Sequence, residues 1–329
     1  MKFILEKYFE SPLKYTNQAI WVSEKRESFI LTDIFKVAEI SIKRKTKIKM
    51  LSEIKNNELA YSMKKPYEER FKSELYNEIW IIGKSGFEYL SKKEYDKFIG
   101  LTAGSNTFFE TTNRYGVHPY KLPMKAKTGF VIEFLKEEIN VLDLKKEWPE
   151  IKYKVPFNGK HVTALSSFNQ SSFIIYGTNS DEIYLQDISE QNSKPTKIDD
   201  CKSVCYQIIV DDKDDLVYIC GMGYLKIFRF KNNKLELISS LQTSTRSMVL
   251  YYDMIVLNKG IHGLELYRLD EHKLVKLDSI EINFSIDLMR LNKTCAKLLV
   301  SSKPIGQLAL INIVREGKKG KSLRGFFKF

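Results

Sequence analysis

A strand–turn–strand pattern recurs along this chain of 329 residues, and no other feature limits its possible folds as strongly. Each copy begins with a short run of apolar, β-branched or aromatic residues, continues through a polar loop that usually contains glycine, and ends in a run of alternating apolar and polar residues. Such runs predict two β-strands joined by a turn. The clearest copies are residues 172–188, 215–230, 253–269 and 297–313, and weaker copies begin at Ser28, Glu78 and Gly129.

The copies follow one another at a nearly regular distance. With the second residue of each copy as a marker, neighbouring markers lie 38 to 51 residues apart, with a mean of about 45. This period is typical of a β-propeller, whose blades are four-stranded sheets of roughly 40 to 50 residues. We therefore expect an all-β fold in which residues 1–329 form a single seven-bladed β-propeller domain, with six or eight blades as alternatives. The markers are Phe29, Ile79, Phe130, Phe173, Leu216, Met254 and Leu298.

The residues around the clearest copies supply the two further strands that a blade needs. Residues 203–210 (SVCYQIIV) precede the copy at 215–230, and residues 234–241 (KLELISSL) follow it. A single sheet with two apolar faces cannot bury both of them alone, so blades must stack face to face. Central strands such as LVYIC are accordingly apolar on nearly every residue.

Either end of the chain offers a strand that could complete the last blade. Residues 18–23 (QAIWVS) serve as the inner strand of the first blade, which leaves residues 2–9 (KFILEKYF) without a blade of their own. A strand added to the last blade removes a free sheet edge that would otherwise invite aggregation. We expect residues 2–9 to take this role, with residues 322–329 as the rival.

Two stretches in the first half depart from the blade pattern. Residues 52–77 are rich in charge and in helix-forming residues, which predicts an inserted helix or an irregular long loop. Residues 100–127 are also irregular, and they hold either a functional loop or the divergent strands of the third blade.

The second half of the chain resembles a known repeat. The segments DLVYICGMGYLKIFRF and GIHGLELYRL are similar to the bacterial LVIVD-type repeat of the β-propeller superfamily, in which a glycine turn precedes a strand. The likeness covers residues 161–313. None of Trp21, Trp80 and Trp148 is followed by aspartate, so the chain is WD-repeat-like without the WD signature, and it has no Gly-Gly pair of the kelch type. The resemblance implies a propeller fold and leaves the function open.

Composition and the N-terminus bear on where the chain works. No run approaches the roughly 18 consecutive apolar residues of a membrane-spanning helix. The opening MKFILEKYFE has too few apolar residues before Glu6 for the core of a secretory signal. Four cysteines in a chain of this length do not make a disulfide framework. We expect a cytoplasmic protein.

The net charge of +12 is concentrated in two short segments. Residues 42–49 hold five basic and no acidic residues, and residues 301–329 hold seven basic residues against Glu316 alone, so eleven of the excess charges lie there. In the blade assignment, the first segment and the basic tail at 315–329 both leave the ring on the face opposite its funnel. We expect them to form one basic patch. Its members are Lys43, Arg44, Lys45, Lys47, Arg315, Lys318, Lys319, Lys321 and Arg324.

The candidates for catalytic groups are few. His161 and His262 fall in loops that open on the funnel face of a propeller, and Asp181 falls in the matching loop of the fourth blade. The three could converge as general acid–base groups. Loop type alone joins them, and the alternative is that they are ordinary surface residues.

Three further motifs have a structural explanation. Gly221 and Gly223 stand before an apolar run as in a phosphate-binding loop, but the run is β-rich and not helical. Cys201 and Cys205 lack the additional ligands of a zinc site nearby in sequence, and the acidic run 211–215 lacks the glycine and the distal glutamate of a calcium loop. We expect a strand turn, buried thiols and a solvated hairpin turn, and we expect no metal and no cofactor.

The leading hypothesis is a non-enzymatic scaffold that mediates protein–protein interaction, with the basic patch from 43–49 and 315–328 contacting an acidic partner. One alternative is a propeller enzyme of the lyase or hydrolase type, with its site in the central funnel. Another is a subunit that associates with RNA or an anionic membrane, in which Phe326, Phe327 and Phe329 would dock or stack beside the basic tail.

Overall fold

The chain forms two compact units in a computed structural model. One unit combines residues 1–53 with residues 246–329, and the other comprises residues 54–245. The structure describes all residues outside 14–17, 24–25, 33–35, 43–45, 54–78, 84–85, 91–123, 126–130, 135–137, 144–149, 159–161, 169–170, 179, 199–200, 202, 303–304 and 316–329.

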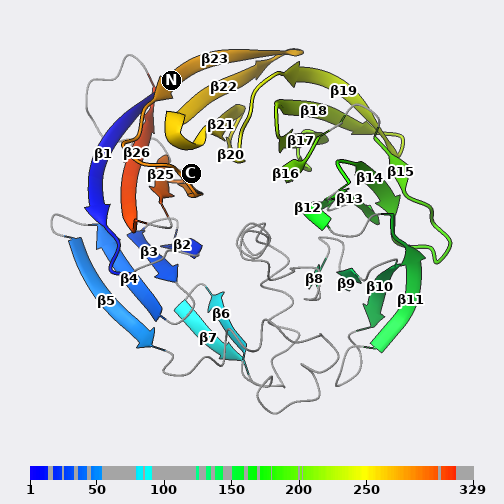
Figure 1. Cartoon of the computed structure of the whole chain (residues 1–329), viewed down its shortest axis with the longest axis horizontal. Helices are drawn as coiled ribbons and strands as arrows, with labels where there is room; N and C mark the ends of the chain where they lie inside the picture. Colours follow the sequence, from blue (N-terminus) through cyan, green and yellow to red (C-terminus); the bar gives the residue numbers. More distant parts are fainter. Residues whose placement is uncertain are drawn as a thin grey trace, which may run out of the picture. The chain divides into compact units, whose positions relative to one another are not determined.

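Three four-stranded antiparallel sheets make up the described part of the first unit (Figure 1). In two of them, strands that follow one another in the sequence are also neighbours in the sheet. One holds β2 (Gln18–Ser23), β3 (Arg26–Thr32), β4 (Lys36–Ile42) and β5 (Thr46–Glu53). Another holds β20 (Ser247–Tyr251), β21 (Met254–Asn258), β22 (Leu264–Asp270) and β23 (Lys273–Ile280). The remaining one has the order β1 (Lys2–Glu10), β26 (Gln307–Val314), β25 (Lys297–Ser301) and β24 (Leu288–Asn292).

The second unit repeats this construction. Its sheets also join strands in sequence order, and every pairing is antiparallel. The first two sheets are β6 (Ile79–Gly83) with β7 (Gly86–Leu90), and β8 (Met124–Lys125), β9 (Val131–Phe134), β10 (Glu138–Asp143) and β11 (Glu150–Pro156). The next holds β12 (Val162–Ser167), β13 (Phe173–Thr178), β14 (Ile183–Asp187) and β15 (Thr196–Lys197). The last holds β16 (Cys205–Asp211), β17 (Leu216–Gly221), β18 (Tyr224–Lys231) and β19 (Lys234–Leu241).

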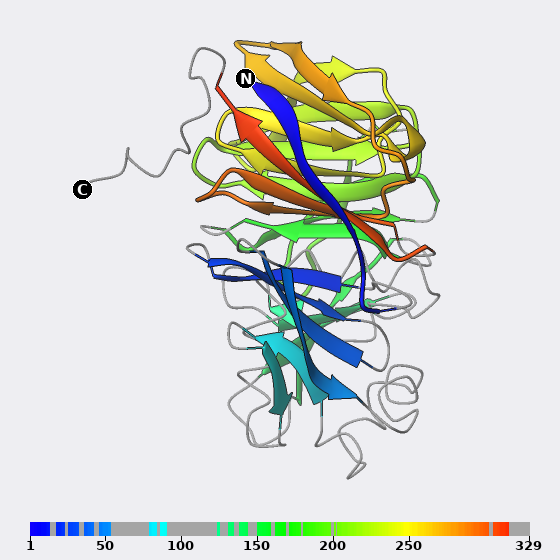
Figure 2. The same ribbon diagram turned by 90° about the vertical axis from the view of Figure 1, so that its left-hand side faces the viewer.

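The N-terminal strand β1 completes a sheet whose other strands come from the C-terminal part of the chain. It runs antiparallel to β26, and Figure 2 shows the two strands side by side. A carboxylate oxygen of Asp278 on β23 accepts a hydrogen bond of 2.6 Å from the backbone N–H of Phe3. The prediction that residues 2–9 complete the last sheet is therefore confirmed. The rival segment, residues 322–329, lies outside the described residues.

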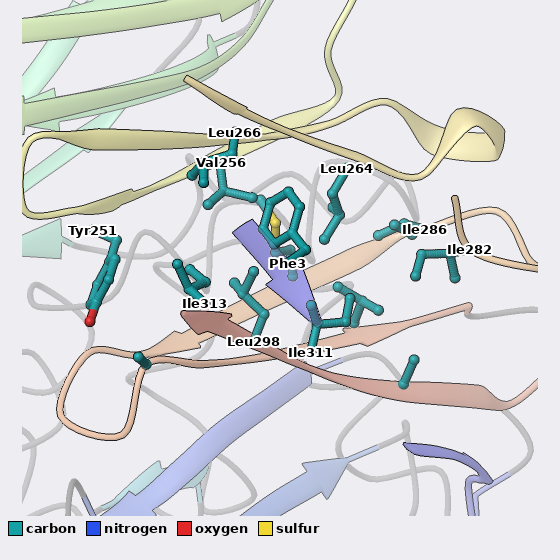
Figure 3. Packing of buried hydrophobic residues seen from close by; sticks show 14 of the residues in the cluster. Phe3, Tyr251, Val256, Leu264, Leu266, Ile282, Ile286, Leu298, Ile311 and Ile313 are labelled. Carbon is teal, nitrogen blue, oxygen red and sulfur yellow. The ribbon is translucent and has the colours of Figure 1, made fainter. Parts of the chain in front are cut away.

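The sheet that contains β26 is buried on both faces. Ala309, Ile311 and Ile313 of β26 belong to an apolar cluster shared with the sheet β20–β23. Leu308 and Leu310 belong to a second cluster, shared with the sheet β2–β5. Successive side chains of a strand point to opposite faces, so a nearly continuous apolar run fills a core on each side. Figure 3 shows the first cluster, where Ile311 and Ile313 lie among side chains of the neighbouring sheet.

Two further apolar clusters bury the sheet β12–β15 in the second unit. Ile174 and Tyr184 pack with residues of β10 and β11 on one face. Ile175 and Leu185 pack with residues of β16, β17 and β18 on the other face. Neighbouring residues thus enter different cores, which explains why the central strands of this sheet need an apolar residue at almost every position.

The structure confirms most of the strands that the repeat predicts. The predicted inner strand at 18–23 is β2, the predicted flanking strands at 203–210 and 234–241 are β16 and β19, and Gly223 lies with φ +88° in the turn between β17 and β18. In the described residues there are six four-stranded sheets and one two-stranded sheet, so seven blades remains a prediction.

The predicted irregular stretches fall almost wholly outside the described residues. Of residues 52–77, Ser52 and Glu53 end strand β5 and the others are not described, so the inserted helix or loop remains a prediction. Of residues 100–127, the two residues of β8 are described. No helix in the described ranges is long and apolar enough to cross a membrane.

Candidate functional site

The predicted acid–base residues are only partly within the described chain. His262 is exposed in the short 3-10 helix η4 (Gly260–His262), which lies between β21 and β22. Asp181 is exposed in the turn between β13 and β14, with φ 59°. His161 lies outside the described residues, and Asp181 and His262 belong to different units. Convergence of the three therefore stays a prediction.

The loop that carries η4 is held by a buried asparagine. Asn258 has no exposed surface, and its side-chain oxygen accepts a hydrogen bond of 2.8 Å from the backbone N–H of Gly260. Its amide nitrogen donates to the hydroxyl of Ser247 and to the backbone oxygen of Ile286, both at 3.2 Å. One side chain thus joins the start of the loop to β20 and to the β23–β24 connection. A buried polar group satisfied in this way specifies one loop conformation.

This ordered loop presents a large apolar side chain to solvent. Ile261, in the middle of η4, is 68% exposed. The equivalent loops between the second and third strands of two other sheets do the same, because Met222 is 60% exposed and Ile305 is 57% exposed. A single exposed apolar residue is ordinary on a protein surface. Its recurrence at the same position of three sheets is the feature that sequence reasoning missed, and the signal was an apolar residue within or beside the glycine turn (GMG, GIHG, PIG).

Charged side chains around η4 largely neutralise one another. The Arg246 guanidinium lies 3.6 Å from a carboxylate oxygen of Asp287. Glu265 lies 2.6 Å from the ammonium of Lys276 and 3.8 Å from that of Lys259. Burial raises the pKa of the Glu265 carboxyl, but the hydrogen bond from Lys276 and the two ammonium charges outweigh it and lower that pKa overall. The surroundings of Ile261 therefore favour an apolar contact over recognition of a strongly charged ligand.

The cysteines and the acidic run have structural positions, as expected. Cys201 and Cys205 are buried thiols that form no disulfide, and burial raises the pKa of the Cys205 thiol well above its usual value. Asp211 ends β16, and its side chain accepts a hydrogen bond of 3.1 Å from the backbone N–H of Lys213 in the hairpin turn. Within the described chain, no three side chains of His, Cys, Asp or Glu gather in a group that could hold a metal ion.

Thiol reactivity tests the burial of the cysteines. Cys201, Cys205 and Cys220 are buried, whereas Cys295 is only partly buried. Because the thiolate is the reactive form and burial suppresses it, we expect one thiol per folded chain to react quickly with a disulfide reagent and the other three to react only on unfolding. Cys295→Ser should abolish the fast phase. Fast reaction of two or more thiols, followed by absorbance with and without urea, would contradict these positions.

Two members of the predicted basic patch are described. Lys47 is exposed near the start of β5, and Arg315 is exposed directly after β26. Both belong to the first unit. The patch as a whole stays a prediction because its other members lie outside the described residues: Lys43, Arg44, Lys45, Lys318, Lys319, Lys321 and Arg324.

The comparisons with known proteins identify the fold. No protein-family model matches the sequence, and no curated protein matches it. Among solved structures, a chain of the mitotic checkpoint complex aligns with a TM-score of 0.58 and 8% identity over 93% of this chain and 94% of that chain. This likeness, together with the succession of antiparallel four-stranded sheets, decides the fold class. The fold is a β-propeller. At 8% identity, the match establishes the propeller fold and carries no function.

Other solved structures resemble smaller parts of the chain. The β-propeller domain of Cps50 (Swd1) from Myceliophteria thermophila aligns with a TM-score of 0.45 and 12% identity over 56% of this chain and 66% of that domain. A protein from Lactobacillus plantarum aligns with a TM-score of 0.46 and 11% identity over 57% of this chain and 65% of its own.

Proposed function

We propose that this propeller is a non-enzymatic scaffold that binds protein partners through the loops between the second and third strands of its blades. The basic segments 43–49 and 315–328 add an electrostatic contact with an acidic partner. The scaffold role rests on the propeller fold and on the side chains that these loops expose.

The observation that carries the proposal is the repeated exposure of Met222, Ile261 and Ile305. Each is more than half exposed in the same kind of loop of its sheet. Large aliphatic side chains that stay in water contribute little to folding, but they contribute strongly to binding when a partner covers them. Loops held by buried hydrogen bonds, such as that of Asn258, lose little conformational entropy on binding.

The electrostatic part rests on the charge distribution along the sequence. Eleven of the twelve excess positive charges lie in residues 42–49 and 301–329. Such clustering accelerates association with an acidic surface and makes binding sensitive to salt. Lys47 and Arg315, the described members, are both exposed.

Capture of partners from an extract of the native organism tests the loop contact. We expect Ile261→Ser with Ile305→Ser to reduce the captured partner about tenfold, because residues at the centre of an interface commonly contribute more than 1 kcal/mol each. Val275→Ser on β23, which removes an exposed apolar side chain from the sheet that flanks η4, is the control and should change nothing. Equal capture by both variants, quantified by mass spectrometry, would refute the loop contact.

The same capture separates the electrostatic alternatives. Deletion of residues 315–329 should weaken capture, and the loss should shrink as salt is raised. Capture that nuclease treatment abolishes would identify an RNA-dependent association. Binding to anionic lipid vesicles without a protein partner would identify a membrane-associated subunit.

A further inference from the structure

Strand β1 turns one face toward the sheet β2–β5. Phe9 stands on this face, opposite Leu308, and packs with the apolar cluster that contains Leu308 and Phe29. Alternation along the strand, corrected for the β-bulge between Leu5 and Lys7, places Lys2, Ile4 and Lys7 on the same face.

The facing outer strand, β5, also presents an isoleucine. Ile48 lies opposite Ile40 in the β4–β5 pairing, and Ile40 is fully buried in the cluster that β1 helps to cover. Paired residues share a face of the sheet, so Ile48 points to the same side as Ile40. The Lys7 ammonium donates a hydrogen bond of 2.5 Å to the hydroxyl of Thr46, the first residue of β5, which joins β1 to β5 at this point.

The apolar core that contains Ile40 does not extend to the outer part of the facing surfaces of β1 and β5. Ile4 is 44% exposed and Ile48 is 50% exposed, although Ile40 beside Ile48 has no exposed surface. Lys2 and Lys7 are exposed as well. We call Lys2, Ile4, Lys7 and Ile48 the β1–β5 surface.

The β1–β5 surface carries positive charge that no described carboxylate balances. Glu6, in the bulge of β1, lies 3.0 Å from the buried ammonium of Lys297, so its charge is already matched. In the described part of the chain, no ion pair joins Lys2 or Lys7 to a carboxylate. Three more basic residues, 43–45, immediately precede β5 in the sequence.

We propose that the β1–β5 surface binds a protein segment in which apolar side chains are flanked by carboxylates. This inference rests on the proposed scaffold function. It specifies the kind of protein segment that binds at the basic part of the scaffold. The isoleucines would cover the apolar side chains, and Lys2 and Lys7 would pair with the flanking carboxylates.

The shape of this surface favours a peptide over a nucleic acid or a membrane. Ile4 and Ile48 are half-buried, so together they expose too little apolar surface to anchor the protein in a bilayer. Neither an aromatic ring nor an arginine belongs to the β1–β5 surface, whereas single-stranded nucleic acids are held by stacking on such groups.

Two charge-matched peptides test the inference on the full chain. The first has two leucines flanked by glutamates, and in the second both leucines are serines. We expect the chain to bind the leucine peptide about tenfold more tightly in fluorescence anisotropy, because covering part of two leucine side chains lowers the binding free energy by that order. Ile4→Ser with Ile48→Ser should remove this preference and leave the affinity for the serine peptide unchanged. Leu237→Ser on β19 is the matched control, because Leu237 is 42% exposed and belongs to the other unit.

The outcomes separate this inference from the proposed function. Equal affinity of the full chain for both peptides would overturn the β1–β5 surface, and so would a preference for the leucine peptide that survives in the double variant. In either case, salt-sensitive binding of the serine peptide would still support an acidic partner. Binding to anionic vesicles but to neither peptide overturns the surface and the acidic protein partner together. Lys2→Gln with Lys7→Gln should weaken both peptides, and an unchanged affinity overturns the role of the two lysines.

Discussion

A variant that lacks residues 1–10 is expected to lose its cooperative unfolding transition and to aggregate. The deletion removes β1 from β26 along the whole length of that strand and exposes an apolar sheet edge. It also removes Phe3, which is 7% exposed, from one core and Phe9 from another. Full burial of one such side chain contributes about 2 kcal/mol, and a typical domain is stable by about 5–15 kcal/mol.

The ion pair between Glu6 and the buried Lys297 adds to this loss. Lys297 is 8% exposed, and the deletion takes away the Glu6 carboxylate at 3.0 Å from its ammonium. The cost is below the about 3 kcal/mol of a fully buried pair, because the Glu6 side chain is 32% exposed.

Thermal melts followed by circular dichroism, together with the soluble yield, measure the effect of the deletion. Ile4→Ser, which keeps β1 and changes one exposed side chain, should melt within a few degrees of the unchanged protein. A synthetic peptide of residues 1–10 should partly restore the transition if pairing with β26 is the cause. A truncated chain that melts like the full chain would contradict the structural role of β1.

Gly263→Ala is expected to destabilise the protein by about 3 kcal/mol or more. Gly263 has φ +80° and ψ −132°, a backbone conformation that side chains disfavour. An added Cβ would lie 2.0 Å from the backbone oxygen of Ile280 and 2.9 Å from the Cα of Glu281. Backbone atoms of a paired strand cannot move aside as a flexible side chain does, so both the strain and the clash remain.

Gly223→Ala is the matched control for this clash. Gly223 also has a positive φ, +88°, but an added Cβ there meets nothing within 4 Å. Its cost should be near 1–2 kcal/mol from the backbone conformation alone. Urea unfolding of both variants measures the difference, and equal midpoint shifts would show that contact with β23 does not matter at Gly263.

The repeat made the central strands predictable from the sequence. Prediction of the strands ended where the repeat becomes weak. Residues 215–230 contain all of β17 and all of β18 except its last residue, Lys231, because both alternation and the glycine turn are local properties of the chain. The pairing of residues 2–9 with the last sheet was also predictable. These residues have the pattern of a strand but no blade of their own, and the last sheet has a free edge with which such a strand can pair. The stretches 52–77 and 100–127 lack both signals, and pattern reasoning there yields only alternatives.

The sequence predicted the type of loop that forms the candidate site, but it did not predict which side chain that loop exposes. His262 was assigned correctly to a loop between the second and third strands of its sheet, yet the large apolar side chain that this loop exposes is its neighbour Ile261. Both Ile261 and Leu264 are apolar residues of the same short segment. Leu264 has no exposed surface because it enters the core of its sheet, whereas Ile261 is held outside by the η4 turn.

The sequence by itself determined the all-β class, the order of the strands within each clear repeat, and the concentration of positive charge at two segments. These properties depend on residues that lie close together in the chain. The tertiary structure alone decided that Ile40 is buried while Ile4 and Ile48 remain half-exposed. Exposure depends on which residues of another sheet lie over a side chain, and that information is spread over segments hundreds of residues apart.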